Sequence, residues 1–183
     1  MQKISEIVSM SSINYDLTKI RAFVFDIDGV LSPSVIPMSA TGEPMRMLNI
    51  KDGYALQLAV KHGYRIAILT GANTKAVEVR YRGLGITDVF LAAAVKLPIL
   101  RQWMCHNNLD AGQVAYCGDD IPDLHCMSEV GLPVAPADAA PEVIAVAKYV
   151  TRCNGGYGVA RDVIEQVMKA QGKWLDEKHA FGW

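Results

Sequence analysis

Short apolar segments alternate with longer helix-like segments along most of this chain, and this alternation limits the folds that it can adopt. Segments 21–26, 64–70 and 113–119 are rich in β-forming residues and apolar nearly throughout, and weaker segments of the same kind lie at 87–92 and 131–135. Helix-like segments lie between and after them, at 52–63, 73–85, 96–109, 139–147 and 159–172. Apolar strands that alternate with helices predict an α/β fold with a doubly wound parallel sheet, covered by helices on both faces.

The 183 residues suit one domain, which we expect at 21–172, with an N-terminal extension at 1–20 and a C-terminal tail at 173–183. Segment 31–50 interrupts the alternation with three prolines and a Thr-Gly-Glu-Pro turn, and it predicts a β-hairpin flap. The tail has no helical periodicity and ends in aromatic residues, so we expect it to lie on a protein surface.

The composition excludes several classes of protein. Lys and Arg number 18 against 19 Asp and Glu, which leaves no basic surface of the kind that binds nucleic acid. No segment is long and apolar enough to span a membrane, and the N-terminus lacks a signal-peptide pattern, so we expect a cytoplasmic protein. The four cysteines show no metal-binding spacing and are expected to be reduced. The four histidines (His62, His106, His125 and His179) have no mutual spacing that indicates a metal site.

Polar signals stand at the carboxyl ends of the predicted strands, which is where open α/β sheets bind their ligands. Each signal alone is weak, because two aspartates can form a solvated turn and a lysine can lie exposed at the start of a helix. Together and in this order they indicate an active site. The residues are Asp26 and Asp28 after the first strand, Thr70 and Gly71 after the second, Lys96 after the third, and Asp119, Asp120 and Asp123 after the fourth.

These residue types suit phosphoryl transfer. A carboxylate such as Asp26 can attack a phosphate group and hold it as an acyl phosphate. Two negative groups repel each other, so a divalent cation is needed between them, and oxygen ligands favour Mg²⁺. We therefore expect Mg²⁺ at Asp26, Asp28 and Asp119.

The remaining polar residues can be given roles in the same reaction. Asp28 would protonate the leaving alcohol and later deprotonate water. Thr70 and the amides that follow it would bind the phosphate oxygens, and Lys96 would neutralise their charge. Asp120 and Asp123 would orient Lys96 or a metal-bound water.

These four signals resemble the motifs of the haloacid dehalogenase superfamily in its phosphatase branch. The matching stretches are DIDGV at 26–30, Thr70, Lys96 and GDDIPD at 118–123. Too few residues separate Asp28 from Thr70, and Thr70 from Lys96, for the cap domain that many members carry. A capless site is open to water, so either a large substrate or a neighbouring subunit would close it.

A closer resemblance is to the 3-deoxy-D-manno-octulosonate 8-phosphate phosphatases, through the flap, NIKDGYAL at 49–56 and GGYGVARD at 155–162. It implies a Mg²⁺-dependent homotetramer that acts in lipopolysaccharide precursor synthesis, with the flap and tail at subunit contacts. It also implies a set of substrate-binding residues, namely Asp28, Asn49, Ile50, Lys51, Asp52, Gly53, Thr70, Gly71, Arg80 and Lys96.

Two positions depart from that family. Ala72 stands where an arginine follows the Thr-Gly of the second motif, and Gln57 replaces a second arginine. The loss of two cations should weaken recognition of a 2-keto carboxylate or shift it to residues of another subunit. Three readings therefore stay open: an octulosonate 8-phosphate phosphatase, a phosphatase for a nonulosonate 9-phosphate or another small phosphate monoester, and a non-catalytic partner of a sugar-acid nucleotidyltransferase. The intact Asp26, Asp28 and Lys96 argue against the last.

Overall fold

The computed structural model describes residues 11–182. The first half of the predicted N-terminal extension (1–10) and the tail residue Trp183 lie outside the described residues. Within the described part of the extension, Leu17 and Ile20 are buried in the same core as the first strand.

Six parallel strands form one sheet in the order β3-β2-β1-β4-β5-β6. Consecutive strands fill one half of the sheet outward from β1, and the chain then crosses back to fill the other half, which makes the sheet doubly wound. The strands are β1 (Ala22–Phe25), β2 (Arg65–Leu69), β3 (Asp88–Phe90), β4 (Val114–Cys117), β5 (Leu132–Ala135) and β6 (Tyr149–Val150).

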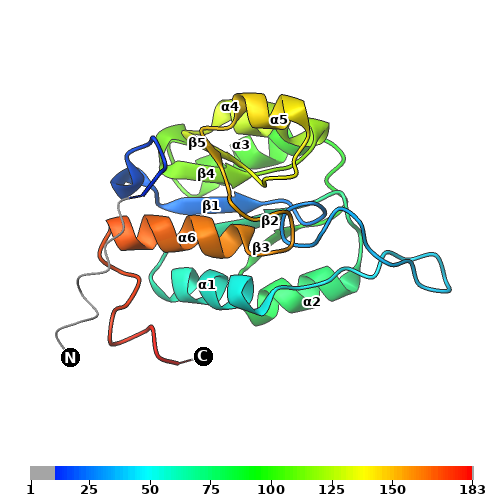
Figure 1. Ribbon diagram of the computed structural model, residues 1–183, viewed down its shortest axis with the longest axis horizontal. Helices are drawn as coiled ribbons and strands as arrows, with labels where there is room; N and C mark the ends of the chain where they lie inside the picture. Colours follow the sequence, from blue (N-terminus) through cyan, green and yellow to red (C-terminus); the bar gives the residue numbers. More distant parts are fainter. Residues whose placement is uncertain (1–10, 183) are drawn as a thin grey trace.

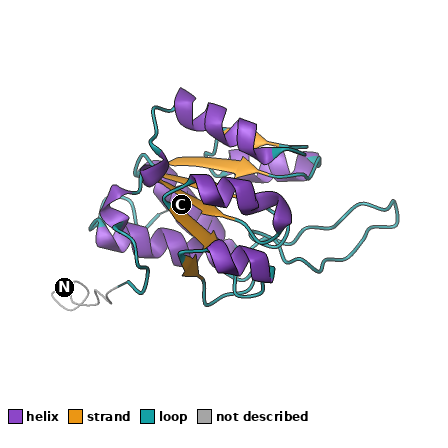
Figure 2. Ribbon diagram, turned by 90° about the horizontal axis from the view of Figure 1, so that it is seen from above, coloured by secondary structure: helices purple, strands orange, loops and turns teal. Residues whose placement is uncertain are grey.

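Helices cover both faces of the sheet, as Figures 1 and 2 show. One face carries α1 (Ile50–Lys61), α2 (Lys75–Gly83) and α6 (Val159–Ala170). The other carries α3 (Lys96–His106), α4 (Leu124–Glu129) and α5 (Pro141–Val146). Short 3₁₀ helices add η1 (Leu17–Lys19), η2 (Ala111–Gln113) and η3 (Ile121–Asp123).

The alternation of side chains along β1 explains why both faces are covered. Phe23 and Phe25 point into the core beneath α1, α2 and α6, whereas Ala22 and Val24 point into the core beneath α3, α4 and α5. Because successive strand residues face opposite sides, a strand that is apolar throughout must be buried on both. The predicted fold class is therefore confirmed.

Each predicted strand and helix is present, with ends that differ by a few residues. Among the described residues, one strand and one α-helix were missed, besides the short 3₁₀ helices. The missed β6 has two residues and α4 has six, too short for a periodic pattern to stand out. In the part of the chain that the structure describes, no helix combines the length and the apolar composition that a membrane crossing requires.

The flap turns back on itself, but the prediction that it forms a β-hairpin is wrong. Segment 31–49 contains no strand, and its two arms share one isolated bridge, between Met38 and Pro44. Prolines at 33, 37 and 44 lack the N–H groups that a ladder of hydrogen bonds needs. In both views the flap extends away from the body of the molecule, beyond the carboxyl ends of the strands.

The C-terminal tail forms a series of turns that pack against α1 and α6 of the same chain. The indole of Trp174 is buried, and it packs edge-on against Tyr54 of α1 and beneath the guanidinium of Arg161 of α6. Tyr54 also donates a hydrogen bond to the carbonyl of Ala180, while the ring of Phe181 is exposed. The tail is therefore attached to the outer side of the α1–α6 pair.

The pair of helices α1 and α6 is held together by a buried carboxylate. Asp52, in the first turn of α1, accepts a hydrogen bond of 2.7 Å from the backbone N–H of Arg161, in the first turn of α6. Its other oxygen, Oδ2, is buried without a hydrogen-bond partner. Burial raises the pKa of this carboxyl to about 6, against hydrogen bonding from Arg161, which lowers it.

The raised pKa of Asp52 predicts a pH-dependent stability. The folded value of about 6 exceeds the value of about 3.9 in unfolded chains, so protonation favours the folded state. This contribution is complete below about pH 4 and is lost as the pH rises through about 6. The amide in Asp52→Asn cannot ionise. Near pH 8 the free energy of unfolding of this variant should therefore exceed that of wild type by up to about 3 kcal/mol, relative to the difference between them near pH 4.

Urea unfolding in the presence of a chelator, at several values between about pH 4 and about pH 8, measures this difference. Glu142→Gln, an exposed carboxyl in the first turn of α5, is the control and should follow the wild type. If the free energies of unfolding of Asp52→Asn and wild type changed with pH in the same way, the prediction would be contradicted.

Candidate active site

The carboxyl ends of β1 and β4 bring the predicted acidic residues together. These strands are neighbours in the sheet. Asp26 directly follows β1, and Asp119 follows β4 after one intervening residue. One carboxylate oxygen from each of Asp26, Asp119 and Asp123 lies within 4.8 Å of the others. They line a cavity of about 580 Å³ whose wall also includes Asp28, Thr70, Gly71, Lys96 and Asp120.

Lys96 lies at the centre of a buried ion cluster. Its ammonium Nζ is 2.7 Å from Oδ2 of Asp26 and 2.7 Å from Oδ1 of Asp123, and its side chain is 4% exposed. Tyr116 donates a further hydrogen bond of 2.7 Å to Oδ1 of Asp123. Burial alone would lower the pKa of Lys96, but Asp26 and Asp123 raise it, so the lysine is charged.

One lysine does not balance the carboxylates around it. Burial raises the pKa of Asp119 to about 8, and the charges of Asp26 and Asp123 raise it further in the same direction. Burial, followed by the charge of Asp123, also raises the pKa of Asp26, to about 6, against the effect of Lys96. The raised pKa values show that burial and mutual repulsion disfavour the charged carboxylates. A divalent cation would offset this repulsion, so these oxygen donors fit a metal site.

Asp26 and Asp119 are better placed to bind a cation than the other acidic residues. The carboxylate of Asp123 already accepts hydrogen bonds from Lys96 and Tyr116, and a third from the backbone N–H of Asp119. The carboxylate of Asp28, which we expected as a ligand, is paired with an arginine instead. The carboxylate group that the structure assembles therefore contains Asp123 in place of Asp28.

A glycine allows the first strand and the fourth to approach each other at the site. Gly29 has a φ angle of +82°, and a Cβ atom built there would lie 1.8 Å from Oδ2 of Asp119. Only glycine meets both requirements. The predicted motif at 155–162 supports the same loop, because Gly156 donates a hydrogen bond of 2.8 Å to the carbonyl of Val30.

Thr70 and Gly71 follow the end of β2 and line the same cavity. The hydroxyl of Thr70 is buried and accepts a hydrogen bond of 3.1 Å from the backbone N–H of Ala72. Gly71 is exposed. Their expected contacts with phosphate oxygens stay a prediction.

Arg46 is a residue of the site that the sequence did not reveal. It comes from the flap, and its guanidinium donates from Nε to Oδ1 of Asp28 at 2.8 Å and from Nη2 to Oδ2 at 2.7 Å. A third donor, Nη1, reaches the hydroxyl of Thr74 at 2.9 Å. The side chain is 14% exposed, so this two-pronged ion pair closes one side of the cavity.

Most of the residues expected to bind substrate lie apart from this cavity in the single chain. Asn49 caps α1, Asp52 accepts a hydrogen bond from the N-terminus of α6, and Arg80 packs against Gly53. These four residues line a separate cavity of only about 10 Å³. Ile50 and Lys51 are exposed and lie near Trp174. Only Asp28, Thr70, Gly71 and Lys96 of the expected set face the large cavity.

The chain is similar to known phosphatases and to a known family of hydrolases. The family described as haloacid dehalogenase-like hydrolase matches residues 85–163. The 3-deoxy-D-manno-octulosonate 8-phosphate phosphatase of Escherichia coli K12 is 42% identical over 158 residues, which cover 86% of this chain and 84% of that protein.

Two crystal structures of phosphatases with that name are also similar to this chain. The one from Yersinia pestis is 37% identical, with a TM-score of 0.84 over 88% of this chain and 87% of the other. The one from Moraxella catarrhalis, described as a complex with a magnesium ion, a phosphate ion and a KDO molecule, is 30% identical. Its TM-score is 0.85, over 91% of this chain and 96% of the other.

The contacts of Arg46 predict a specific loss of activity. Arg46→Ala removes a cation from the wall of the cavity, and one charge-assisted interaction of the kind it can make is worth about 1.5–3 kcal/mol, so phosphatase kcat/KM should fall about tenfold to a hundredfold. Arg46→Lys keeps the charge but not the two-pronged geometry and should recover only part of it.

Steady-state phosphate release measures this effect. Arg101→Ala, which breaks a surface ion pair with Glu129 outside the cavity, is the matched control and should leave kcat/KM unchanged. Equal losses in the two alanine variants would show that Arg46 has no particular role.

Proposed function

We propose a function on the premise that this chain belongs to the 3-deoxy-D-manno-octulosonate 8-phosphate phosphatase family of haloacid dehalogenase-like hydrolases, as its similarity over most of both chains shows. It is a phosphoric monoester hydrolase. We infer that its substrate is 3-deoxy-D-manno-octulosonate 8-phosphate, which it hydrolyses in the cytoplasm to inorganic phosphate and the free sugar acid. The observation that carries this proposal is the buried cluster of Asp26, Lys96 and Asp123 beside Asp119.

The reaction would proceed in two displacements. An oxygen of ionised Asp26 attacks phosphorus, and the bond between phosphorus and the sugar oxygen breaks, which leaves the phosphoryl group on Asp26. Asp28 gives a proton to the departing sugar oxygen and then takes one from a water molecule. That water attacks phosphorus, the bond to Asp26 breaks, and phosphate is released.

Lys96 and Asp123 support both displacements. Because Lys96 is charged and within 2.7 Å of Asp26, it offsets the negative charge that collects when a phosphate approaches this carboxylate. Asp123 and Tyr116 hold the ammonium in place. Asp26 and Asp119 would hold a divalent cation, and Mg²⁺ suits their oxygen atoms; when bound, it supplies positive charge between carboxylate and phosphate.

Arg46 would give the substrate a cation in the same cavity that Ala72 lines. In the structure the guanidinium of Arg46 pairs with both carboxylate oxygens of Asp28. A substrate carboxylate that competes for the guanidinium would release Asp28 to carry a proton. This exchange supports a sugar acid as substrate; Ala72 and Gln57 keep a nonulosonate 9-phosphate as the second candidate, because that substrate also carries a carboxylate.

We also propose that the chain acts as a homotetramer in which flaps meet other subunits. The flap exposes large apolar side chains that are costly to leave in water. Val35 is 87% exposed and Met38 72%, and Met45, Met47, Leu48 and Ile50 are each about half exposed or more. Burial of these side chains at a subunit contact would also bring Ile50 and Lys51 next to a neighbouring cavity.

Asp26→Asn tests the proposed nucleophile. An amide is a poor nucleophile, so phosphate release from octulosonate 8-phosphate with Mg²⁺ should fall to background while the thermal midpoint stays close to that of wild type. Asp120→Asn, on the exposed rim of the same cavity, is the control and should retain measurable turnover. Substantial turnover by Asp26→Asn would refute the mechanism.

The oligomer can be measured by light scattering after size-exclusion chromatography. Wild type should have a mass of about four chains of 20.0 kDa each. The flap variants Val35→Asp and Met38→Asp should have a lower mass, because a buried charge without a partner disfavours the contact. Val79→Asp, equally apolar and 61% exposed on α2, should leave the mass unchanged. A monomeric wild type would contradict the proposal.

A further inference from the structure

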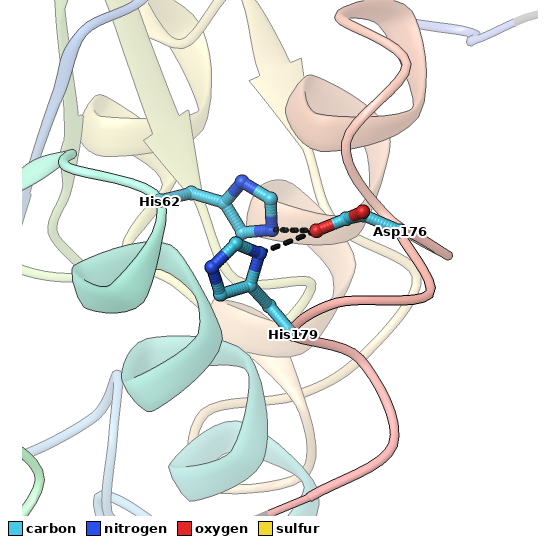
Figure 3. A group of neighbouring side chains, drawn as sticks. All are labelled: His62, Asp176 and His179. Atoms are coloured by element: carbon cyan, nitrogen blue, oxygen red, sulfur yellow. Dashed lines mark hydrogen bonds and ion pairs between the residues drawn. The ribbon is translucent and has the colours of Figure 1, made fainter.

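A second group of side chains that could bind a metal, drawn in Figure 3, shares no residue with the catalytic cavity. His62 follows the last turn of α1, and Asp176 and His179 come from the C-terminal tail. No spacing in the sequence indicated a shared site among the histidines, since His62 and His179 are far apart along the chain. The fold of the tail against α1 brings them together.

The three side chains direct donor atoms to one point. Oδ2 of Asp176 contacts Nδ1 of His179 and lies 3.6 Å from Nε2 of His62. All three atoms lie within 4.8 Å of one another, and the two imidazole rings are 4.7 Å apart between centroids. Donor atoms around a tetrahedral zinc ion stand about 3.3–3.6 Å apart, because each is about 2.0–2.2 Å from the metal. The separation between Asp176 and His62 matches this spacing, whereas the direct hydrogen bond between Asp176 and His179 would open when an ion binds.

His62 provides a second observation that points to a ligand at this group. Its side chain is 10% exposed, and its Nε2 atom is buried without a hydrogen-bond partner. Buried polar atoms nearly always have a partner, so this nitrogen needs an explanation. The atom is turned toward the same carboxylate oxygen that contacts His179, where a cation would satisfy all three groups at once.

We propose that His62, Asp176 and His179 bind a divalent transition-metal ion of the zinc class. Two imidazole nitrogens and one carboxylate oxygen suit Zn²⁺, whereas Mg²⁺ prefers oxygen ligands alone. Asp176 and His179 are about one-third exposed, so water can reach the fourth position. This site differs in chemistry and in place from the all-carboxylate group at Asp26 and Asp119.

A metal ion here would cross-link the tail to α1. The tail is otherwise attached through Trp174 and through single hydrogen bonds, such as that of 3.1 Å from Lys61 to the carbonyl of Gly182. Lys51 and Ile50, at the start of α1, lie in the same groove as Trp174 and Leu175. Zinc would therefore order the segment next to two residues expected to bind substrate.

Zinc titration of the full-length chain tests this proposal. The protein is stripped with a chelator, dialysed, and titrated with Zn²⁺ by calorimetry in millimolar Mg²⁺, with a phosphine reductant to keep the thiols reduced. The test uses Asp119→Asn as background, in which the catalytic metal group is impaired. This background should bind about one zinc ion per chain.

Substitution of the ligands should remove this binding. On the same background His62→Gln and His179→Gln should each weaken zinc binding at least about tenfold, because each removes one of three ligands. His106→Gln, an exposed histidine outside the group, is the matched control and should change nothing. Circular dichroism and thermal midpoints in chelator show whether the variants fold as the background does.

Two further readouts separate a metal site from a simple hydrogen-bonded group. Co²⁺ in place of Zn²⁺ should give the visible absorption of a tetrahedral nitrogen-containing site in the background but not in His62→Gln. Zinc should also slow trypsin cleavage after Lys173 and Lys178 in the background alone. Equal zinc affinity in His62→Gln, His179→Gln and the background, or no zinc bound at all, would overturn the proposal.

Discussion

The site depends on one buried ion cluster, in which the ammonium of Lys96 lies between the carboxylates of Asp26 and Asp123. Charges are removed from water here at a high cost, and their mutual attraction offsets it only because each has a close partner. Asp119 adds a third carboxylate that Lys96 cannot also balance. The excess of negative charge is the physical reason that a phosphatase with these residues needs a divalent cation.

The parallel sheet assembles this cluster from distant parts of the chain. Because β1 and β4 are neighbours that run in the same direction, the residues after them meet at one edge. Lys96 arrives from the first turn of α3, and Asp123 from the turn before α4. The core therefore positions the buried cluster, while the projecting flap supplies Arg46, whose guanidinium pairs with Asp28.

Much of this arrangement could be predicted from sequence, because it rests on local patterns. Apolar strands that end in Asp26, Thr70 and Asp119 identify both the sheet and the edge that binds ligands. Arg46 could not be predicted in this way, since nothing in a proline-rich flap tells which cavity a side chain will reach. The contact of His62 with His179 also depends on tertiary packing, which no sequence spacing records.

The identity of the substrate is the central claim. It can be tested by measuring kcat/KM for phosphate release with Mg²⁺ on each candidate substrate. The substrates to compare are octulosonate 8-phosphate, nonulosonate 9-phosphates and simple hexose phosphates. We predict a preference of at least about tenfold for octulosonate 8-phosphate, equivalent to roughly 1.4 kcal/mol. An equal rate with all of them, or a preference for another sugar, would mean that Arg46 does not compensate for Ala72 and Gln57, and would contradict the account.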